Sequence, residues 1–475
     1  MNACRAARVF GLSGSVAVSL IAGAASAQDA ASLAMGLPAR PTIGMNRWQE
    51  DWSVLADPSL RTEPFDDLKY IPLSPDDPKS YVSFGLDLRE RFESLNAATF
   101  GVGGVPVQNY VLDRQYIHAD IRPNQNWQIF IQLQNDYAPG KFIITPADRD
   151  PLDLAQGFVA YTGGLADGEV KVRVGRQEMA FDLQRFVSIR DGPNVRQAYD
   201  AAWFDWKKDP WRIISFWSEP VIYVPQGVFN DYSNGHFQYG GFRIERRDVG
   251  PGHLSAYYSR YDLDNSHFLF ASGPERRNIF DVHYAGDASG WDWDLETMVQ
   301  TGSVGAKTAR AWALGTLGGF TFAGANWRPR LGLQVDAASG DQNPSSSTLG
   351  TFNPLFPNGY YFTLAGFTGY VNLIHVKPSV TVKPTSSLAL LAAAGLQWRE
   401  TTADAVYVQP NIPVPGTAGS AGRWTGAYGQ IRADYKFNGH LTGAIEAVYF
   451  GVGSAIRRAG GHDSDYVGVE LDFGW

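Results

Sequence analysis

Cysteine is almost absent from this sequence of 475 residues: the single example, Cys4, lies near the N-terminus. Downstream of it there is no cysteine, which excludes disulfide bonds, thiolate metal sites and a cysteine nucleophile from the rest of the chain. Long apolar runs are missing as well, since no stretch of about 18 apolar residues follows residue 27. We therefore expect no transmembrane helix, and the sequence shows no convincing amphipathic helix.

Charged residues are also scarce, at 19% of the sequence, and the formal net charge is −8. The net charge becomes −10 without Arg5 and Arg8, the two charged residues of the first 27 positions. A chain this acidic is not expected to bind nucleic acid through bulk charge. The eight histidines are scattered, and no nucleophile elbow occurs. We therefore expect no transition-metal site, no cofactor and no enzymatic activity.

The first 27 residues have the pattern of a secretory signal peptide. A basic start is followed by an apolar stretch over 9–25 and by the small-residue cleavage site Ala25-Ser26-Ala27. The apolar stretch is interrupted by glycines and is short for a membrane span of roughly 20 residues. We predict a signal peptide over 1–27 that is cleaved near Ala27, before Gln28.

What the chain does contain is glycine, aromatic residues and short alternating segments. There are 51 glycines, and aromatic residues make up 13% of the chain. In the final stretch, Val467, Val469, Leu471 and Phe473 alternate with small or charged residues. A strand that separates lipid from an aqueous lumen requires this period of two, with one wholly apolar face. The pattern predicts an all-β fold, a transmembrane antiparallel β-barrel in the outer membrane of a Gram-negative bacterium.

Eighteen segments fit such strands, an even number as in single-chain bacterial barrels. Short connections such as 208–210 suit periplasmic turns, and long ones such as 178–198 and 339–366 suit extracellular loops or segments folded into the lumen. The proline-rich stretch 28–80 is predicted to be an extended periplasmic segment, and 81–475 the barrel. The predicted strands lie at 81–93, 110–122, 127–137, 152–161, 169–177, 199–207, 211–218, 238–247, 253–262, 278–286, 291–301, 308–317, 329–338, 369–382, 388–400, 423–436, 440–450 and 466–475.

Several longer motifs allow a comparison with known families. They are WQEDWSVLAD (48–57), LKYIPL (68–73), LDLRERFE (86–93), GRQE (175–178) with RFVSIRDGPNVR (185–196), and SGD (339–341) with TFNPLFP (351–357). Together they resemble the alginate export family of outer-membrane proteins, from Trp48 to Trp475. The resemblance implies a monomeric barrel of 18 strands that exports an acidic polysaccharide, alginate, through an electropositive pore.

A pore for an anionic polymer needs guanidinium groups that face the lumen, because arginine stays charged and binds carboxylates through two hydrogen bonds. Several weak sites in series let a polymer chain move on. Strand parity and the inward folding of 176–196, which contains the turn sequence Asp191–Asn194, supply such groups. The predicted pore-lining residues are Arg89, Arg91, Lys171, Arg173, Arg176, Arg185, Arg190, Arg196, Arg243, Arg399 and Arg432.

Two alternatives, in which these residues have only a structural role, stay open. The arginines can be salt-bridge partners inside the barrel, because acidic residues such as Glu93 and Glu245 lie two positions away on the same strand faces. The 176–196 connection can be an outer loop held by its own charge pairs. Asp148 and Asp150 with Asp153, like Asp262-Leu-Asp264-Asn265, could hold Ca²⁺ on oxygen ligands, but they lack a calcium-loop spacing and are interpreted as solvated loop charge.

The leading hypothesis is a passive export channel for an anionic, alginate-like polysaccharide. Its partners would be outer-membrane lipid and lipopolysaccharide, the polysaccharide itself and a periplasmic export machinery. One alternative is a substrate-selective porin that takes up small anionic or aromatic solutes. Another is a barrel enzyme or an adhesin that transports nothing.

Overall fold

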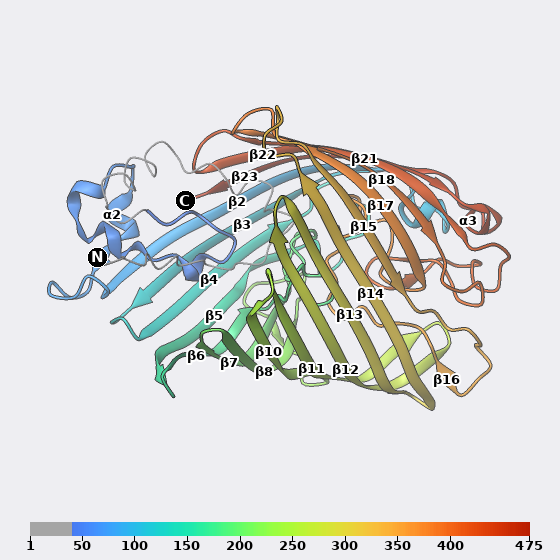
Figure 1. The fold of residues 1–475 in the computed structure, drawn as a ribbon, viewed down its shortest axis with the longest axis horizontal. Coiled ribbons are helices and arrows are strands. Elements are labelled where there is room, and N and C mark those ends of the chain that lie inside the picture. The colour runs from blue at the N-terminus through green and yellow to red at the C-terminus, as the bar shows by residue number, and fades with distance from the viewer. Residues whose placement is uncertain (1–39) are drawn as a thin grey trace.

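The computed structural model describes residues 40–475, so the predicted signal peptide and the first part of the 28–80 segment lie outside the described residues. Eighteen long strands form one antiparallel sheet that closes, because the first strand pairs with the last (Figure 1). The predicted fold class and strand number are confirmed. The strands of the barrel are β2 (Tyr81–Leu95), β3 (Gln108–Arg122), β4 (Trp127–Tyr137), β5 (Asp150–Leu165), β6 (Gly168–Glu178), β7 (Ala198–Lys208), β8 (Trp211–Ile222), β10 (Phe237–Val249), β11 (Gly252–Phe268), β12 (Ala271–Ala288), β13 (Trp291–Val304), β14 (Lys307–Thr321), β15 (Arg330–Ala338), β17 (Leu373–Val382), β18 (Leu388–Trp398), β21 (Trp424–Lys436), β22 (Leu441–Val452) and β23 (Ser464–Gly474).

The remaining elements are short and lie outside the barrel wall or in its connections. Within residues 40–475, no helix has the length and apolar character needed to cross a membrane. These elements are η1 (Arg47–Gln49), η2 (Trp52–Ala56), η3 (Pro58–Leu60), α2 (Asp66–Lys69), β1 (Ile71–Pro72), η4 (Ala98–Gly101), β9 (Tyr232–Ser233), β16 (Thr348–Leu349), β19 (Tyr407–Val408), β20 (Ile412–Pro413) and α3 (Ser454–Arg458).

The two faces of the wall follow the alternation of the sequence. On β23, Val467, Val469, Leu471 and Phe473 are 37% to 47% exposed and point outward. Tyr466, of the opposite parity, is buried in the interior, where its hydroxyl contacts acidic side chains. The outward face therefore presents apolar side chains to lipid, and the inward face carries the polar groups.

Connection lengths distinguish the two ends of the barrel. Short turns such as 123–126, 209–210 and 383–387 lie at the end that holds the last residue of β23. Much longer connections, notably 179–197 and 339–372, lie at the other end. Outer-membrane barrels keep their short turns in the periplasm, so the long connections belong to the extracellular end.

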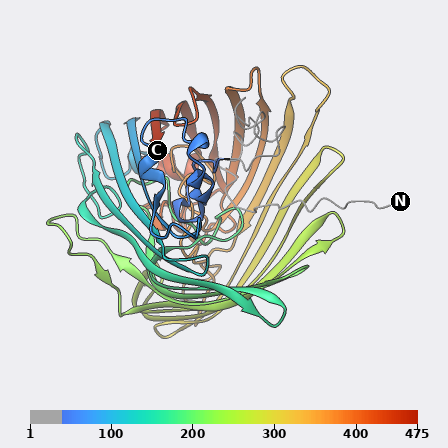
Figure 2. The same ribbon diagram turned by 90° about the vertical axis from the view of Figure 1, so that its left-hand side faces the viewer.

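Residues 40–80 differ from the extended segment that the sequence predicts, because their short helices fold against the barrel. Asp51 accepts a hydrogen bond from the Ser53 N–H at the start of η2, and Asp57 does the same for Ser59 at the start of η3. Figure 2 shows the segment in dark blue, in front of the barrel opening near the C-terminus. Arg47 fixes it at the seam where β2 meets β23, donating to the Trp475 carbonyl at 2.7 Å.

Candidate functional site

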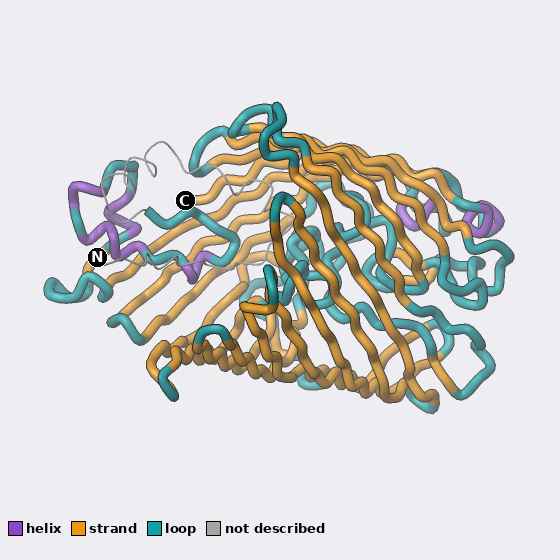
Figure 3. Tube along the Cα trace, viewed as in Figure 1, coloured by secondary structure: helices purple, strands orange, loops and turns teal. Residues whose placement is uncertain are grey.

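Two long connections, 179–197 and 339–372, fold into the lumen and pack on each other. Figure 3 shows loops, in teal, within the outline of the barrel. The 179–197 segment meets the 339–372 segment through backbone bonds: Ser188 donates to the Phe356 carbonyl at 3.0 Å, and Phe356 donates to the Phe186 carbonyl at 2.9 Å. Phe186 and Phe356 are buried in an aromatic cluster that also contains Phe352 and Tyr370. The 176–196 stretch therefore folds inward, as the sequence predicts. Together the two inserted segments narrow the interior of the barrel.

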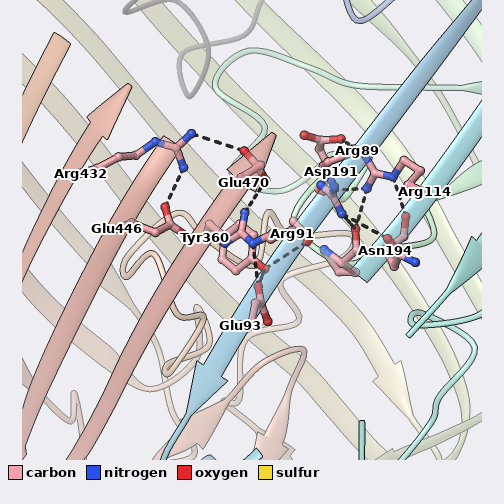
Figure 4. Close-up of polar contacts among 12 residues, drawn as sticks. Arg89, Arg91, Glu93, Arg114, Asp191, Asn194, Tyr360, Arg432, Glu446 and Glu470 are labelled. Carbon is pink, nitrogen blue, oxygen red and sulfur yellow. Dashed lines mark hydrogen bonds and ion pairs between the residues drawn. The ribbon is translucent and has the colours of Figure 1, made fainter. Parts of the chain in front are cut away.

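Two arginines of the wall hold the turn of the 179–197 segment (Figure 4). Arg89 on β2 and Arg114 on β3 donate to the backbone carbonyl of Asp191, at 2.7 and 2.9 Å. The Asp191 carboxylate accepts from Arg114 and from Arg196, at 2.6 Å in each case. Burial opposes the charge of Asp191, but Arg196, Arg114 and Arg89 outweigh it and hold the pKa of this carboxyl well below its usual range. These guanidinium groups are therefore used to position the segment.

Arg91 lies next to this turn and is surrounded by carboxylates. It donates to Glu93 at 2.7 Å, to Glu470 at 2.8 Å and to Glu446 (Figure 4). The ring of Tyr360, from the 339–372 segment, lies 4.8 Å from its guanidinium carbon, and the Tyr360 hydroxyl is 3.2 Å from Glu93. The inserted segment thus closes over an ion-paired arginine.

Arg432, on β21, belongs to the same group of charges (Figure 4). Its guanidinium donates to Glu446 at 2.6 Å and to Asp434 at 2.8 Å, and it lies 3.6 Å from Glu470. Two arginines therefore share the carboxylates of β22 and β23, which leaves little free positive charge at this part of the wall.

Arg185 anchors the 179–197 segment on the opposite side of the lumen. It is fully buried and donates to Asp294 at 2.5 Å and to Glu296 at 2.8 Å, both on β13. Gly315 makes room for it, because a Cβ there would lie 2.5 Å from the Arg185 Nε. Although burial opposes the charge, the neighbouring Tyr361, Glu296 and Asp294 raise the pKa of Arg185 well above its usual value.

Three further predicted residues also have strong protein acceptors. Arg243 donates to both oxygens of Asp182, at 2.5 and 2.6 Å, and Arg176 donates to both oxygens of Asp200, at 3.0 and 3.1 Å. Arg399 is fully buried after β18 and donates to backbone carbonyls between residues 402 and 422. Arg399 therefore holds its own loop together.

Lys171 and Arg173 on β6 lie against an aromatic ring of the N-terminal segment. The Trp48 ring centroid is 4.4 Å from the Lys171 Nζ and 4.3 Å from the Arg173 guanidinium carbon. The Arg173 Nη1 is buried and has no hydrogen-bond partner within residues 40–475. The π-face of tryptophan thus takes the place of a carboxylate for these two cations.

Arg190, like Arg173, has no strong acceptor for its head group among the described residues, but it lies on the inserted segment and not on the wall. Within residues 40–475 no carboxylate or carbonyl bonds its guanidinium, which lies 6.0 Å from the centre of the Phe356 ring. Burial lowers the pKa of Arg190, as expected for a charge held from water without a counter-charge. Its φ of 54° is in the left-handed region, which is uncommon outside glycine. Arg190 borders a cavity of about 180 Å³ together with Tyr261, Glu275 and Asn411.

Strand parity and loop length therefore place the predicted cations in the lumen, but they do not reveal which groups each cation bonds to. The salt-bridge alternative describes six of the eleven residues. Among the others, Arg89 and Arg399 donate to backbone carbonyls, and Lys171, Arg173 and Arg190 have neither a carboxylate nor a backbone carbonyl partner within residues 40–475. Arg114 and Tyr360 were missed. The parity of strand 110–122 carries a signal for Arg114, since it shares its face with Tyr110 and Tyr116, whereas no local pattern marks Tyr360.

Comparison with known proteins shows which family the sequence matches and which solved structures share this fold. The chain matches the family model described as alginate export over residues 80–470. No curated protein matches it. Solved structures from Pseudomonas aeruginosa share the fold. OccK3 (OpdO) has a TM-score of 0.56 at 10% identity, covering 83% of this chain and 95% of that one.

Two further structures from the same organism share this fold. The outer membrane protein OpdK has a TM-score of 0.53 at 10% identity, covering 83% of this chain and 98% of that chain. OccK2 (OpdF), solved in complex with glucuronate, has the same TM-score, identity and coverages. A closed barrel with a lipid-facing wall, a polar interior and a match over most of its length leaves one assignment: the chain belongs to the alginate export family and forms an outer-membrane channel.

Proposed function

We propose that this channel passively exports an anionic, alginate-like polysaccharide, and that Arg190, on an inserted segment, is the group that meets the polymer inside the lumen. The observation that carries the proposal is the unpaired guanidinium of Arg190 on an inserted segment, beside a cavity. A carboxylate of the polymer would supply the counter-charge that no described residue supplies. Family membership supports the same class of substrate.

Passage requires the two inserted segments to separate. Their contacts are hydrogen bonds, aromatic packing and ion pairs at the lumen wall, which a local rearrangement can break while the barrel stays closed. When the 339–372 segment withdraws, Arg91 loses the cover of Tyr360, and Arg91 and Arg432 add weak sites in series with Arg190. Weak sites in series favour movement over tight binding, and net flux follows the concentration gradient of the polymer.

Planar-bilayer recording tests this proposal. We expect anion preference in a salt gradient, and block of the current by oligouronates added to one side. Arg190→Gln should weaken this block about tenfold, or about 1.4 kcal/mol, because it removes a charge-assisted hydrogen bond. Arg246→Gln is the matched control, since it removes the same charge from an exposed residue paired with Asp248. A cation-selective pore that Arg190→Gln leaves unaltered would contradict the proposal.

A second candidate is uptake of small anionic or aromatic solutes. It is favoured by the closed arrangement of the inserted segments and by a cavity of about 180 Å³, below the roughly 300–1,000 Å³ of drug-sized pockets. Liposome flux distinguishes the two functions. Uptake of small solutes predicts rapid flux of a monomeric uronate and exclusion of its oligomers, whereas export of a polymer predicts that oligomers also pass.

We further propose the processing and assembly expected from the sequence. Residues 1–27 are a signal peptide removed near Ala27, residues 28–80 stay in the periplasm, and 81–475 form the barrel as a monomer that works with a periplasmic export machinery. N-terminal sequencing of the protein from outer membranes tests the cleavage, and light scattering in detergent tests the monomer.

A further inference from the structure

Three aspartates, two from the start of β5 and one from the connection after β8, meet at the extracellular end of the barrel. Asp150 and Asp153 begin β5, and Asp231 precedes β9 in the connection after β8. One carboxylate oxygen of each lies within 4.8 Å of the others. Asp153 holds the two pieces of chain together, because its Oδ2 accepts the backbone N–H groups of Asn230 at 2.6 Å and of Asp231 at 3.2 Å.

The oxygens at the centre of this group lack donors. Asp150 is completely buried; Gln134 donates to its Oδ2, and its Oδ1 has no partner within residues 40–475. Asp231 accepts from the Val224 N–H through Oδ1 at 2.9 Å, and its Oδ2 is buried without a partner. The Oδ1 of the neighbouring Asn230 is likewise buried and unpartnered.

One carboxylate oxygen of Asp150 lies within 4.8 Å of one of Asp231. Two buried carboxylates this close repel unless a proton or a cation lies between them. Asp150 and Asp231 therefore need a positive partner that no described side chain provides.

A second cluster of three carboxylates in the described chain shows how the protein neutralises such a group. It consists of Asp182, Asp281 and Glu296. Arg243 donates to both oxygens of Asp182, and Arg185 donates to Glu296 at 2.8 Å. Two of its three carboxylates thus have guanidinium groups of the chain itself as counter-charges, whereas both oxygens of Asp281 are buried without a partner among residues 40–475.

Neither Arg149 nor Arg176, the arginines beside this cluster, forms an ion pair with Asp150, Asp153 or Asp231. Arg176 gives its head group to the Asp200 carboxylate and reaches only the backbone carbonyl of Asp231, at 3.5 Å. Arg149 lies 5.5 Å from the centre of the Tyr137 ring. The cation that balances this cluster must therefore come from solution.

We propose that Asp150, Asp153 and Asp231 bind one Ca²⁺ ion, with the Asn230 amide oxygen and water completing its shell. Ca²⁺ takes about six to eight oxygen ligands at roughly 2.3–2.6 Å and accepts irregular geometry. Two oxygens on one such ion are at most about 5 Å apart, which the 4.8 Å spacing satisfies. Mg²⁺ demands a near-ideal octahedron and dehydrates reluctantly, so a set of buried side-chain oxygens favours Ca²⁺.

The ion would stiffen the frame that carries the 179–197 segment. It joins the start of β5 to the connection after β8. On the same side, Val195 donates to the Ala147 carbonyl at 3.0 Å, and the Asn194 amide donates to the Asp148 carbonyl at 3.2 Å. An ion at the start of β5 thus acts two residues from a contact that holds the inserted segment. This inference does not depend on which solute the channel carries.

Calorimetric titration of the full-length, detergent-folded protein with CaCl₂, after chelation and at constant ionic strength, tests the proposal. We expect one saturable site per chain, with a Kd of about 10⁻⁴–10⁻³ M as in extracellular calcium modules. The unfolding temperature should rise by a few degrees at saturation, because the ion binds the folded state alone. MgCl₂ at the same concentration should give a clearly smaller rise. Absence of saturable binding at pH 7.5, the result that a proton shared by Asp150 and Asp231 predicts, would overturn it.

A pair of variants separates binding from general effects of charge. Asp231→Asn should weaken Ca²⁺ binding at least tenfold. Without calcium it should fold at least as well as the unaltered protein, since the change relieves repulsion. Asp281→Asn is the matched control, because it removes one buried carboxylate charge from the second cluster and leaves Asp150, Asp153 and Asp231 unchanged; it should keep the affinity for Ca²⁺ within twofold. Equal losses in both variants, or an equal rise in unfolding temperature with Mg²⁺, would overturn the proposal.

Discussion

Cations inside this barrel lie in two kinds of surroundings. Arg185 and Arg243 have carboxylate partners on two sides and are almost completely buried. Arg190 and Arg173 contact aromatic rings and have no carboxylate within 4 Å among residues 40–475. A paired arginine mainly fixes structure, because its charge is neutralised by the protein. An unpaired arginine keeps its charge for a ligand, at a cost in stability.

The difference predicts that removing a paired cation damages the fold, whereas removing an unpaired one changes transport or segment docking with little loss of stability. For Arg190 this agrees with the expected result of Arg190→Gln, a weaker block by oligouronates. Three further changes test the same contrast.

Arg185→Met should have the largest effect. It leaves Glu296 buried without its main counter-charge and Asp294 with His283 alone. Breaking a buried pair from one side costs about 3–5 kcal/mol. The 179–197 segment should detach from β13, so we expect a lower unfolding temperature together with a higher single-channel conductance.

The double variant Arg185→Met/Glu296→Gln controls for the buried charge. It should recover part of the stability, because Asp294 keeps its 2.8 Å contact with His283. Conductance should stay high, since the anchor of the segment is still missing. If the single variant unfolds no earlier than the unaltered protein, Arg185 is not the structural residue that its pairing indicates.

Trp48→Ala should have an intermediate effect, because it exposes two unpaired cations. Lys171 and Arg173 lose the ring that they share, and contacts of this kind are worth about 0.5–2 kcal/mol each. We expect the N-terminal segment to be cut faster by protease and the anion preference to rise in bilayer recording. Trp48→Phe keeps a weaker π-face, so its protease sensitivity and anion preference should lie between those of the unaltered protein and of Trp48→Ala. An unchanged ion selectivity would show that these cations do not face the permeation path.

The wall of the barrel could be predicted because its determinants are local. Alternation on β23 distinguishes lipid from lumen residue by residue, and the short turns are visible as breaks in that alternation. The short helices of residues 40–80 were also within reach, since Asp51 and Asp57 each precede a serine by two positions and cap the first turn. The density of prolines directed the prediction to an extended chain instead.

The contents of the lumen could not be predicted, because their contacts join distant parts of the sequence. Arg185 and Asp294 are 109 positions apart, and Tyr360 lies 267 positions from Glu93. Whether such pairs meet depends on closure of the sheet and on the path of two long connections, which neither parity nor propensity encodes. For the same reason the sequence places Arg185 and Arg190 in one motif but does not distinguish the paired arginine from the unpaired one.

The smallest expected effect concerns Lys69, an unpaired cation outside the membrane-spanning strands. Its Nζ is buried without a hydrogen-bond partner between the rings of Trp52 and Trp475. Burial first, and the nearby Arg47 second, lower the pKa of Lys69 to about 7. A detached segment would have the ordinary pKa of about 10.4 and would bind more protons between these two values. Docking of residues 40–80 should therefore strengthen as the pH rises from about 7 to 10 and show no dependence on Lys69 below pH 7.

Hydrogen exchange of residues 40–80, corrected for the intrinsic effect of pH, measures this docking. Protection should increase between pH 7 and 9 in the unaltered protein. Lys69→Met is the control: it removes the titrating group and keeps an apolar stem between the two rings, so its protection should be independent of pH and at least as high at pH 6.5. A rise in protection with pH that survives in Lys69→Met would assign the titration to another group. Because Lys69 has no carboxylate partner in direct contact, its removal should not lower stability, in contrast to the loss expected for Arg185.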